Sequence, residues 1–255
     1  MLDDKVAIVL GASARGGTGW VTAETLAAAG AKVVVGARSI EPLQQLADEI
    51  GGTAVQCDMA NPDDIARLVD VAMETHGQID VAVSAAAQVA RGLILDIDPA
   101  TVQRSFDVNF MGQFHFVRNV AARMTRGGAI TLISSAGATQ PVADRFAYGC
   151  AKAATDTLAR HAAVEFGPRG IRVNSILPGP IRTPMLQDVL ERPGVEEAFV
   201  REIPIGRIAE PKDVAETILW LSVSSYLTGL NLPVSGGMHL MRPPRAEDLG
   251  WQPPR

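Results

Sequence analysis

Cysteine and histidine are scarce in this sequence, and long apolar runs are missing. Among 255 residues there are two cysteines, Cys57 and Cys150, and four histidines that show no metal-ligand spacing. Two cysteines do not make a disulfide framework or a metal site, and we interpret Cys150 as a helix-packing residue. No apolar stretch approaches the ~18 residues that a membrane span needs. We therefore expect no metal site and no membrane partner.

Positive charge is not concentrated anywhere in the chain. The formal net charge is −5 and the basic residues are scattered, which argues against nucleic acid as a partner. The first residues, MLDDKVAIVL, are charged and pass directly into a strand-like run, without the pattern of a signal peptide. A hydrophobic content of 47% with 20% charged residues is typical of a globular α/β protein. These features favour a cytoplasmic protein.

Apolar, β-branched runs alternate with helical patterns along the chain. The strand-like runs are 5–10, 32–35, 54–57, 79–84, 129–134, 171–177 and 230–234, and helical patterns between them include 20–29, 62–75, 101–124, 150–166 and 211–221. This alternation predicts a Rossmann-type doubly wound, seven-stranded parallel sheet in a single α/β domain. Pro233 predicts an edge position for the last strand. We expect the catalytic domain to span residues 1–238, and a tail rich in proline and arginine, residues 239–255, to fall outside the pattern.

A glycine-rich turn, residues 11–19, joins the first strand to the first helix. In a βαβ unit, amides at the amino end of this helix can face the pyrophosphate of a dinucleotide. Glycines are common in any tight turn, but their place between the first strand and the first helix favours dinucleotide binding.

The run from Thr131 to Lys152 carries a candidate proton-transfer site. A strand-like segment ends in Ser134 and Ser135, and a helix then begins near Tyr148 and continues through Lys152. Residues at i and i+4 share a helix face, so the phenol and the ammonium can lie side by side. A nearby cation lowers the pKa of a tyrosine, which suits a general acid and base. Ser135 can donate a hydrogen bond to the same substrate oxygen.

Together these features resemble the short-chain dehydrogenase/reductase family over residues 5 to 238. Asp58 resembles its adenine-contacting aspartate and Asn109 its catalytic asparagine, which supports a water beside the lysine. The resemblance implies that Asn109, Ser135, Tyr148 and Lys152 are catalytic, and that Lys152 also binds the nicotinamide ribose. Residues 170–185 resemble the segment that cups the nicotinamide. The expected cofactor contacts are Gly11, Ser13, Arg15, Gly17, Thr18, Gly19, Arg38, Ser39, Asp58, Met59, Ala85, Ala86, Tyr148, Lys152, Pro178, Gly179, Ile181 and Thr183.

The sequence departs from the family pattern at two connected places. The glycine turn is two residues longer than T-G-x-x-x-G-x-G, and Leu10 replaces its threonine. This turn resembles that of the divergent enoyl-thioester reductases in the same superfamily. The family's N-N-A-G segment reads Ser84-Ala85-Ala86-Ala87 here. We expect an apolar contact at Leu10 to replace the polar contacts that tie the first and fourth strands together.

The end of the second strand indicates which nicotinamide nucleotide is used. Family members that prefer NAD usually have an acidic residue where this chain has Ala37. Arg38 follows, and a guanidinium suits a 2′-phosphate by bidentate, charge-assisted hydrogen bonds. Arg15 can add a second cation and Ser39 a hydroxyl. The sequence therefore favours NADP over NAD.

The resemblance implies reversible, nicotinamide-dependent interconversion of a small-molecule carbonyl and an alcohol. Enoyl-thioester reduction is the first alternative, but those enzymes separate tyrosine and lysine by six residues, and Arg145 occupies that tyrosine position here. A 3-oxoacyl-thioester reductase and a catalytically silent nucleotide-binding regulator remain further alternatives. Silent members usually lose the tyrosine or the lysine, and both are kept here.

Substrate loops in this fold follow the fourth, fifth and sixth strands. Small and apolar residues occur there, and residues 183–205 have the spacing of a helical lid with an apolar underside. We therefore expect a ketone or secondary alcohol on an apolar, cyclic or aromatic skeleton, although Arg182, Arg192 and Arg201 could instead meet an acidic substrate or a thioester carrier. The family implies a homotetramer or homodimer assembled through the helices at 101–124 and 150–166 and the last strand. The residues expected to line the substrate pocket are Ala85, Ala86, Ala87, Val89, Ala136, Ala138, Pro141, Val142, Met185, Leu186, Val189, Leu190 and Phe199.

Overall fold

A parallel β-sheet forms the centre of the molecule. The computed structural model describes residues 1–245 and 247–249, and in this part of the chain seven strands pair in the order β3-β2-β1-β4-β5-β6-β7. The predicted doubly wound sheet is confirmed, and β7 lies at its edge as Pro233 indicated. The strands are β1 (Val6–Leu10), β2 (Lys32–Ala37), β3 (Thr53–Gln56), β4 (Val81–Ser84), β5 (Gly128–Ile133), β6 (Ile171–Pro178) and β7 (Asn231–Val234).

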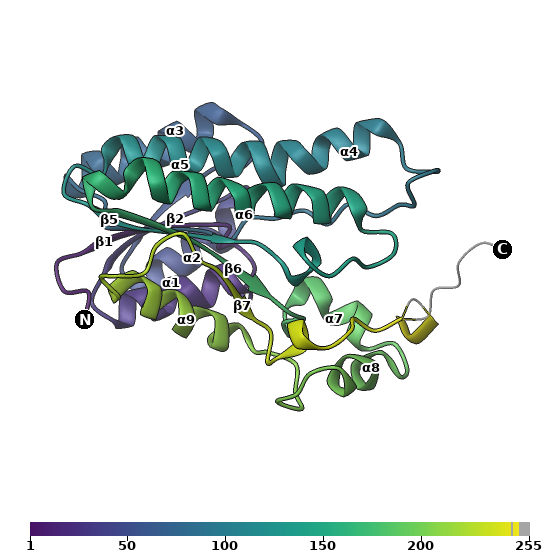
Figure 1. Cartoon of the computed structure of the whole chain (residues 1–255). Helices are drawn as coiled ribbons and strands as arrows, with labels where there is room; N and C mark the ends of the chain where they lie inside the picture. The colour runs from purple at the N-terminus through teal and green to yellow at the C-terminus, as the bar shows by residue number, and fades with distance from the viewer. Residues whose placement is uncertain (246, 250–255) are drawn as a thin grey trace.

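Helices cover both faces of the sheet (Figure 1). One layer contains α1 (Thr18–Ala28), α2 (Ile40–Ile50) and α9 (Pro211–Val223), and the other contains α3 (Pro62–His76), α4 (Pro99–Phe106), α5 (Gly112–Arg123) and α6 (Phe146–Phe166). All five residues of β1 are buried, because a parallel sheet is covered on both sides. Each face of the sheet has its own apolar core.

The helix expected at 101–124 is interrupted. A π-helical stretch, Asp107–Met111, separates α4 from α5 and contains Asn109. Such wider turns often occur at functional sites, because they shift side chains relative to a regular helix. The helical pattern predicted over this range is confirmed, and the π-helical stretch within it is a feature that the sequence did not indicate.

Cys150 does not serve the packing role that we expected. It lies in α6, where its side chain is exposed, whereas Cys57 is buried. The buried face of α6 is formed instead by small residues such as Ala151, Ala159 and Ala162. The prediction for Cys150 was wrong because α6 turns it away from the core.

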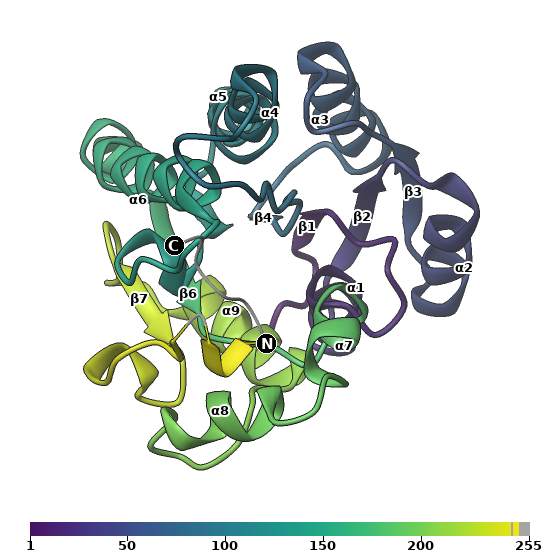
Figure 2. The same ribbon diagram turned by 90° about the vertical axis from the view of Figure 1, so that its right-hand side faces the viewer.

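Two short helices lie beyond the carboxyl ends of the strands (Figures 1 and 2). These are α7 (Pro184–Leu190) and α8 (Val195–Arg201), with Gly194 in a left-handed conformation between them. Their apolar side chains form a third cluster in which Leu190 and Ile203 are packed together with Met238 and Ala136. The segment expected as a lid is thus a pair of helices fixed by its own small core.

The described part of the tail is attached to this helix pair. Arg242 pairs with the buried carboxylate of Glu202 at 3.2 Å, and Asp248 pairs with Arg201 at 3.3 Å. The Gln140 side chain also donates to the carbonyl oxygen of Met241 at 2.9 Å. The described residues of the tail are therefore held against the region at the carboxyl ends of the strands.

Neither a bilayer-crossing element nor a metal cluster is found among the described residues. No helix there is long and apolar enough to cross a membrane. In the same residues no group of three histidine, cysteine, aspartate or glutamate side chains is placed to hold a metal ion.

Candidate active site

A cavity of about 560 Å³ lies at the carboxyl ends of the strands. Its walls come from the glycine turn, the segments after β4, β5 and β6, the start of α6, the α7–α8 pair and the tail. Of the residues expected at the catalytic and cofactor sites, those lining it are Gly11, Gly17, Thr18, Gly19, Ala85, Ser135, Tyr148, Lys152, Pro178, Gly179, Ile181 and Thr183. The topology thus brings segments far apart in sequence to one place.

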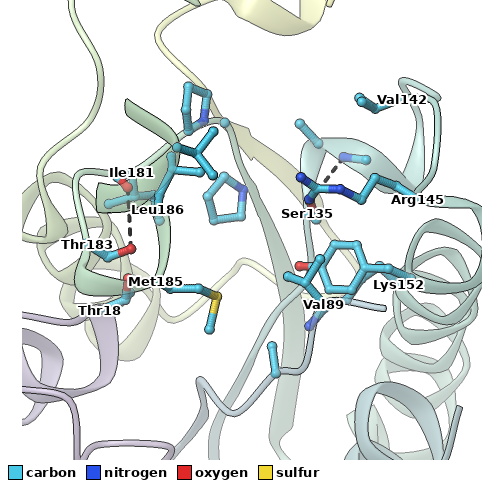
Figure 3. A pocket seen from close by; sticks show the side chains of 18 of the residues that line it. Thr18, Val89, Ser135, Val142, Arg145, Lys152, Ile181, Thr183, Met185 and Leu186 are labelled. Atoms are coloured by element: carbon cyan, nitrogen blue, oxygen red, sulfur yellow. Dashed lines mark hydrogen bonds between the residues drawn. The ribbon is translucent and has the colours of Figure 1, made fainter. Parts of the chain in front are cut away.

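Ser135 and Tyr148 both line this cavity, and Figure 3 shows Ser135 and Lys152 on the same side of it. Ser135 follows β5, where the Gly137 amide donates to its Oγ at 3.1 Å, and its side chain is close enough to the Tyr148 phenol to act on the phenol's pKa. The neighbouring Ser134 is buried and donates to the carbonyl oxygen of Lys152 at 3.2 Å. Ser135, rather than Ser134, therefore faces a reacting group.

Lys152 lies one turn along α6 from Tyr148, and its side chain is fully buried. Its Nζ donates to the carbonyl oxygen of Ile133 at 2.7 Å and lies 5.6 Å from the centre of the Tyr148 ring. Burial lowers the pKa of this ammonium to about 8, against the opposing charge of Asp156. The lysine is held at the base of the cavity by the end of β5.

The pKa of Tyr148 does not move as the sequence suggested. Burial raises the pKa of the phenol, and the hydrogen bond with Ser135 and the charge of Arg145 oppose this rise without cancelling it. The expected lowering of this pKa was wrong, because burial outweighs the groups that favour the phenolate, and the Lys152 Nζ is directed to the Ile133 carbonyl. At neutral pH Tyr148 is a phenol, the form that donates a proton.

Asn109 is buried and does not face the cavity. Its Nδ2 donates to the carbonyl oxygen of Gln88 at 2.8 Å, and its Oδ1 accepts from the Gln88 amide at 3.0 Å. Its own carbonyl oxygen accepts from Thr155 at 2.7 Å. The side chain therefore ties the segment after β4 to the π-helical stretch, which supports the wall next to Lys152.

At two positions of the glycine turn, a side chain would collide with the backbone of the protein. A Cβ on Gly19 would lie 2.2 Å from the carbonyl oxygen of Gly11, and a Cβ on Gly11 would lie 2.4 Å from the Ala86 nitrogen. Gly17 precedes α1 and offers no side-chain cap, so the first amides of α1 have no side-chain acceptor. Unpaired amides at a helix amino end attract phosphate. The backbone amides of this turn can therefore bind a pyrophosphate without help from a side chain.

Several expected cofactor contacts lie outside this cavity, namely Ser13, Arg15, Arg38, Ser39, Asp58, Met59 and Ala86. Arg38 and Ser39 are exposed at the end of β2, where a cofactor extending from the glycine turn would continue. Arg15 pairs with Glu49 at 2.9 Å and lies over the Trp20 ring, so its guanidinium is engaged within the chain.

Leu10, which stands in place of the family's threonine, is part of the apolar core. Leu10 is buried and belongs to the same apolar cluster as Ala86. Strands β1 and β4 remain joined by backbone, since the Ala85 amide donates to the Leu10 carbonyl at 2.7 Å. Among the described residues the buried Ser84 hydroxyl has no hydrogen-bond partner. Apolar packing therefore surrounds Leu10, and the Ser84 hydroxyl is left without a hydrogen-bond partner among the described residues.

Some cavity residues were missed by the sequence reasoning. Among them are Arg91, Gln140, Asp144, Arg145, Met238, Pro243, Pro244 and Leu249. Arg145 could have been found, because it directly precedes the helix that carries Tyr148 and lies three residues before that tyrosine. Nothing in the sequence pattern indicated that Pro243, Pro244 and Leu249 return to the cavity.

A glycine cradle beside a Ser–Tyr–Lys cluster defines a Rossmann-fold oxidoreductase. Residues 11–239 match the family model described as "Enoyl-(Acyl carrier protein) reductase". The chain is 35% identical to 7alpha-hydroxysteroid dehydrogenase of Escherichia coli K12, over 92% of this chain and 94% of that protein. It is also 35% identical to L-rhamnose 1-dehydrogenase (NAD(P)(+)) of a Sphingomonas species, over 94% and 98% respectively.

Comparison with solved structures indicates the same family as these relatives. A short-chain type dehydrogenase/reductase from Mycobacterium ulcerans superimposes with a TM-score of 0.92 at 31% identity, covering 96% of this chain and 94% of that one. The chain belongs to the short-chain dehydrogenase/reductase family. It is therefore an oxidoreductase of a family that uses NAD or NADP.

Proposed function

We propose that this enzyme interconverts a ketone and a secondary alcohol with NADPH or NADP. The observation that carries the proposal is the cluster of Ser135, Tyr148 and Lys152 at one end of a cavity whose other end is the glycine turn. The hydroxysteroid and rhamnose dehydrogenases named above support it, because both names describe oxidation of an alcohol.

In the reducing direction, bound NADPH supplies the hydride for the carbonyl carbon. Tyr148 donates its phenolic proton to the carbonyl oxygen, which suits a tyrosine whose raised pKa keeps it protonated. Ser135 donates a hydrogen bond to the negative charge that grows on this oxygen, where stabilisation is most effective. The Lys152 ammonium stabilises the phenolate that remains and would hold the nicotinamide ribose. Asn109 keeps the adjacent wall in place.

A turnover screen tests this proposal. NADPH consumption should be observed with apolar cyclic and aromatic ketones and should be weaker with ketoses and phosphorylated ketones. Consumption with enoyl thioesters and none with ketones would contradict it.

The apolar-substrate proposal rests on the cavity wall. Val89 and Val142 come from the segments after β4 and β5, and Leu186, Met185 and Phe199 come from the α7–α8 pair. Such a wall suits an apolar cyclic or aromatic skeleton. The two dehydrogenases differ on this point, since one is named for a steroid and the other for a sugar.

Two of the three arginines that could have attracted an acidic substrate are neutralised within the chain. Arg182 pairs with Glu196 at 2.7 Å and with Glu210 at 3.3 Å. Arg201 pairs with Asp248 at 3.3 Å. Of the three, Arg192 alone lines the cavity. These pairs weaken the case for a charged carrier bound by the α7–α8 pair.

NADP preference is the first prediction. The Arg38 side chain makes no ion pair or hydrogen bond among the described residues, and Ala37 beside it is buried and uncharged. We expect kcat/KM with NADPH to exceed that with NADH by about 10- to 100-fold, because a guanidinium binds a phosphate by charge-assisted hydrogen bonds. Arg38→Leu should remove most of this gap, measured by initial rates with both nucleotides.

Arg118→Leu is the matched control, because Arg118 is an exposed arginine on α5. It should leave the NADPH-to-NADH ratio unchanged. A wild-type enzyme that works better with NADH would show that Arg38 serves no 2′-phosphate.

Assembly into a tetramer or dimer is the second prediction. Large apolar side chains are exposed on α6 and near the last strand, where Val164 is 78%, Trp220 50% and Tyr226 97% exposed. Apolar groups left on such surfaces favour contact with another copy of the chain. Light scattering at micromolar concentration should give two or four times the mass of one chain, and the mass of a monomer would contradict the prediction.

Enoyl-thioester reduction is the rival function. It is favoured by the description of the family model and by the long glycine turn. Against it, Arg145 stands where those enzymes have their tyrosine, and its guanidinium cannot act as a phenolic proton donor at that place.

A further inference from the structure

An arginine pair with surplus positive charge lies beside the catalytic residues. Arg91 and Arg145 both pair with Asp144, at 3.1 Å and 3.2 Å. All three residues line the cavity. Two guanidinium groups share one carboxylate, so the trio carries a net charge of +1. The proposed reduction of a neutral ketone does not use this surplus charge.

Asp144 holds the Arg145 side chain in place, but some hydrogen-bond donors of the guanidinium have no partner among the described residues. Its Nε donates to Asp144, and its two terminal nitrogens make no hydrogen bond within the described residues. Asp144 is held in a left-handed conformation, with φ of 66°, and its carbonyl oxygen accepts from the Gly92 amide at 2.9 Å. Asp144 thus fixes the guanidinium at its Nε, and the two terminal nitrogens are available to a ligand.

Arg145 lies near the reacting end of the cavity. Its charge acts on the Tyr148 phenol, and Figure 3 shows Arg145 and Ser135 across the cavity from Thr18 and Met185. Thr18 belongs to the glycine turn, so Arg145 lies on the side away from the proposed pyrophosphate. Partial burial makes its charge costly, and the pKa of Arg145 is lowered mainly by this burial. An anion bound there would offset that cost.

We propose that Arg145 binds a carboxylate of the substrate, attached close to the carbonyl that Tyr148 protonates. This rests on the proposed function and narrows its substrate class to apolar cyclic or aromatic keto acids. A planar guanidinium with both terminal nitrogens free matches the two oxygens of a carboxylate. The surplus of one charge in the Arg91–Asp144–Arg145 trio also suits a monoanion better than a doubly charged phosphate.

Benzoate and benzamide are the probes that test this site, because they differ only in the charged group. Calorimetric titration into the wild-type enzyme should show benzoate binding about 10- to 100-fold more tightly, the range for hydrogen bonds to charged groups. Arg145→Gln should bind the two alike. Arg192→Gln is the matched control, because Arg192 is an exposed arginine on another wall of the same cavity, and it should keep the preference.

Three results would overturn the proposal. These are no benzoate preference in the wild type, an unchanged preference in Arg145→Gln, or loss of the preference in Arg192→Gln alone. Arg145→Lys keeps the charge and loses the planar fork, so it should also weaken the preference. If Arg145→Gln does not fold, an unchanged preference in Arg145→Lys overturns the proposal. Binding is measured without turnover, so failure here is separate from failure of ketone reduction.

Discussion

Tyr148→Phe should reduce kcat/KM for ketone reduction by about 10²- to 10⁴-fold, the range that general acid catalysis supplies. The change keeps the ring and removes the hydroxyl of a residue that lines the cavity next to Ser135. NADPH binding should be largely kept, because the glycine turn is untouched. Fluorescence titration of NADPH and steady-state kinetics separate the two effects.

The chain provides its own control for this substitution. Of its two tyrosines, the other is Tyr226, which is 97% exposed and far from the cavity wall. Tyr226→Phe should leave ketone reduction unchanged. Near-normal turnover in Tyr148→Phe would remove the tyrosine from the mechanism.

Lys152→Met should reduce kcat/KM by about 10²-fold or more, as expected when a preorganised charge is removed from a catalytic site. Methionine has a similar length and fills the same buried space. It cannot donate to the Ile133 carbonyl, which accepts from Nζ at 2.7 Å, and it leaves the Tyr148 phenolate without this cation. Lys212→Met is the control, because that side chain is 76% exposed on α9.

The pH dependence gives a second test of Lys152. Its lowered pKa of about 8 means that the ammonium is present below this pH and is lost as the pH rises through it. Tyr148 stays protonated through this range, because its own pKa is raised. Wild-type kcat/KM for reduction should therefore fall above about pH 8. This decline should be missing in Lys152→Met, and its persistence there would assign it to another group.

The sheet could be predicted because its strands are short apolar runs between turn signals. β1 and β4 are buried along their whole lengths, so the run of apolar residues alone identifies them. The π-helical stretch could not be predicted, since one wider turn at Asn109 barely changes the apolar pattern of residues 101–124. In the fold this stretch makes tertiary contacts that the pattern does not encode, namely the hydrogen bonds between Asn109 and Gln88.

The site was predictable where its residues are near in sequence. Tyr148 and Lys152 share a helix face at any ordinary helical geometry, and Ser135 ends the preceding strand. The direction of the Lys152 ammonium was not predictable, because it depends on the position of the Ile133 carbonyl. Likewise, the role of Arg145 depends on Arg91, which the fold brings to Asp144 from 53 residues away.

The most direct test of the account is the destination of the hydride. The enzyme is incubated with NADPH deuterated at C4 and with cyclohex-2-enone, which offers both a carbonyl and a carbon–carbon double bond. The proton donor Tyr148 beside Ser135 predicts deuterium on the carbinol carbon of cyclohex-2-enol. Deuterium at C3 of cyclohexanone would show a double-bond reductase and contradict the account, as would a complete lack of transfer to this enone and to saturated cyclic ketones.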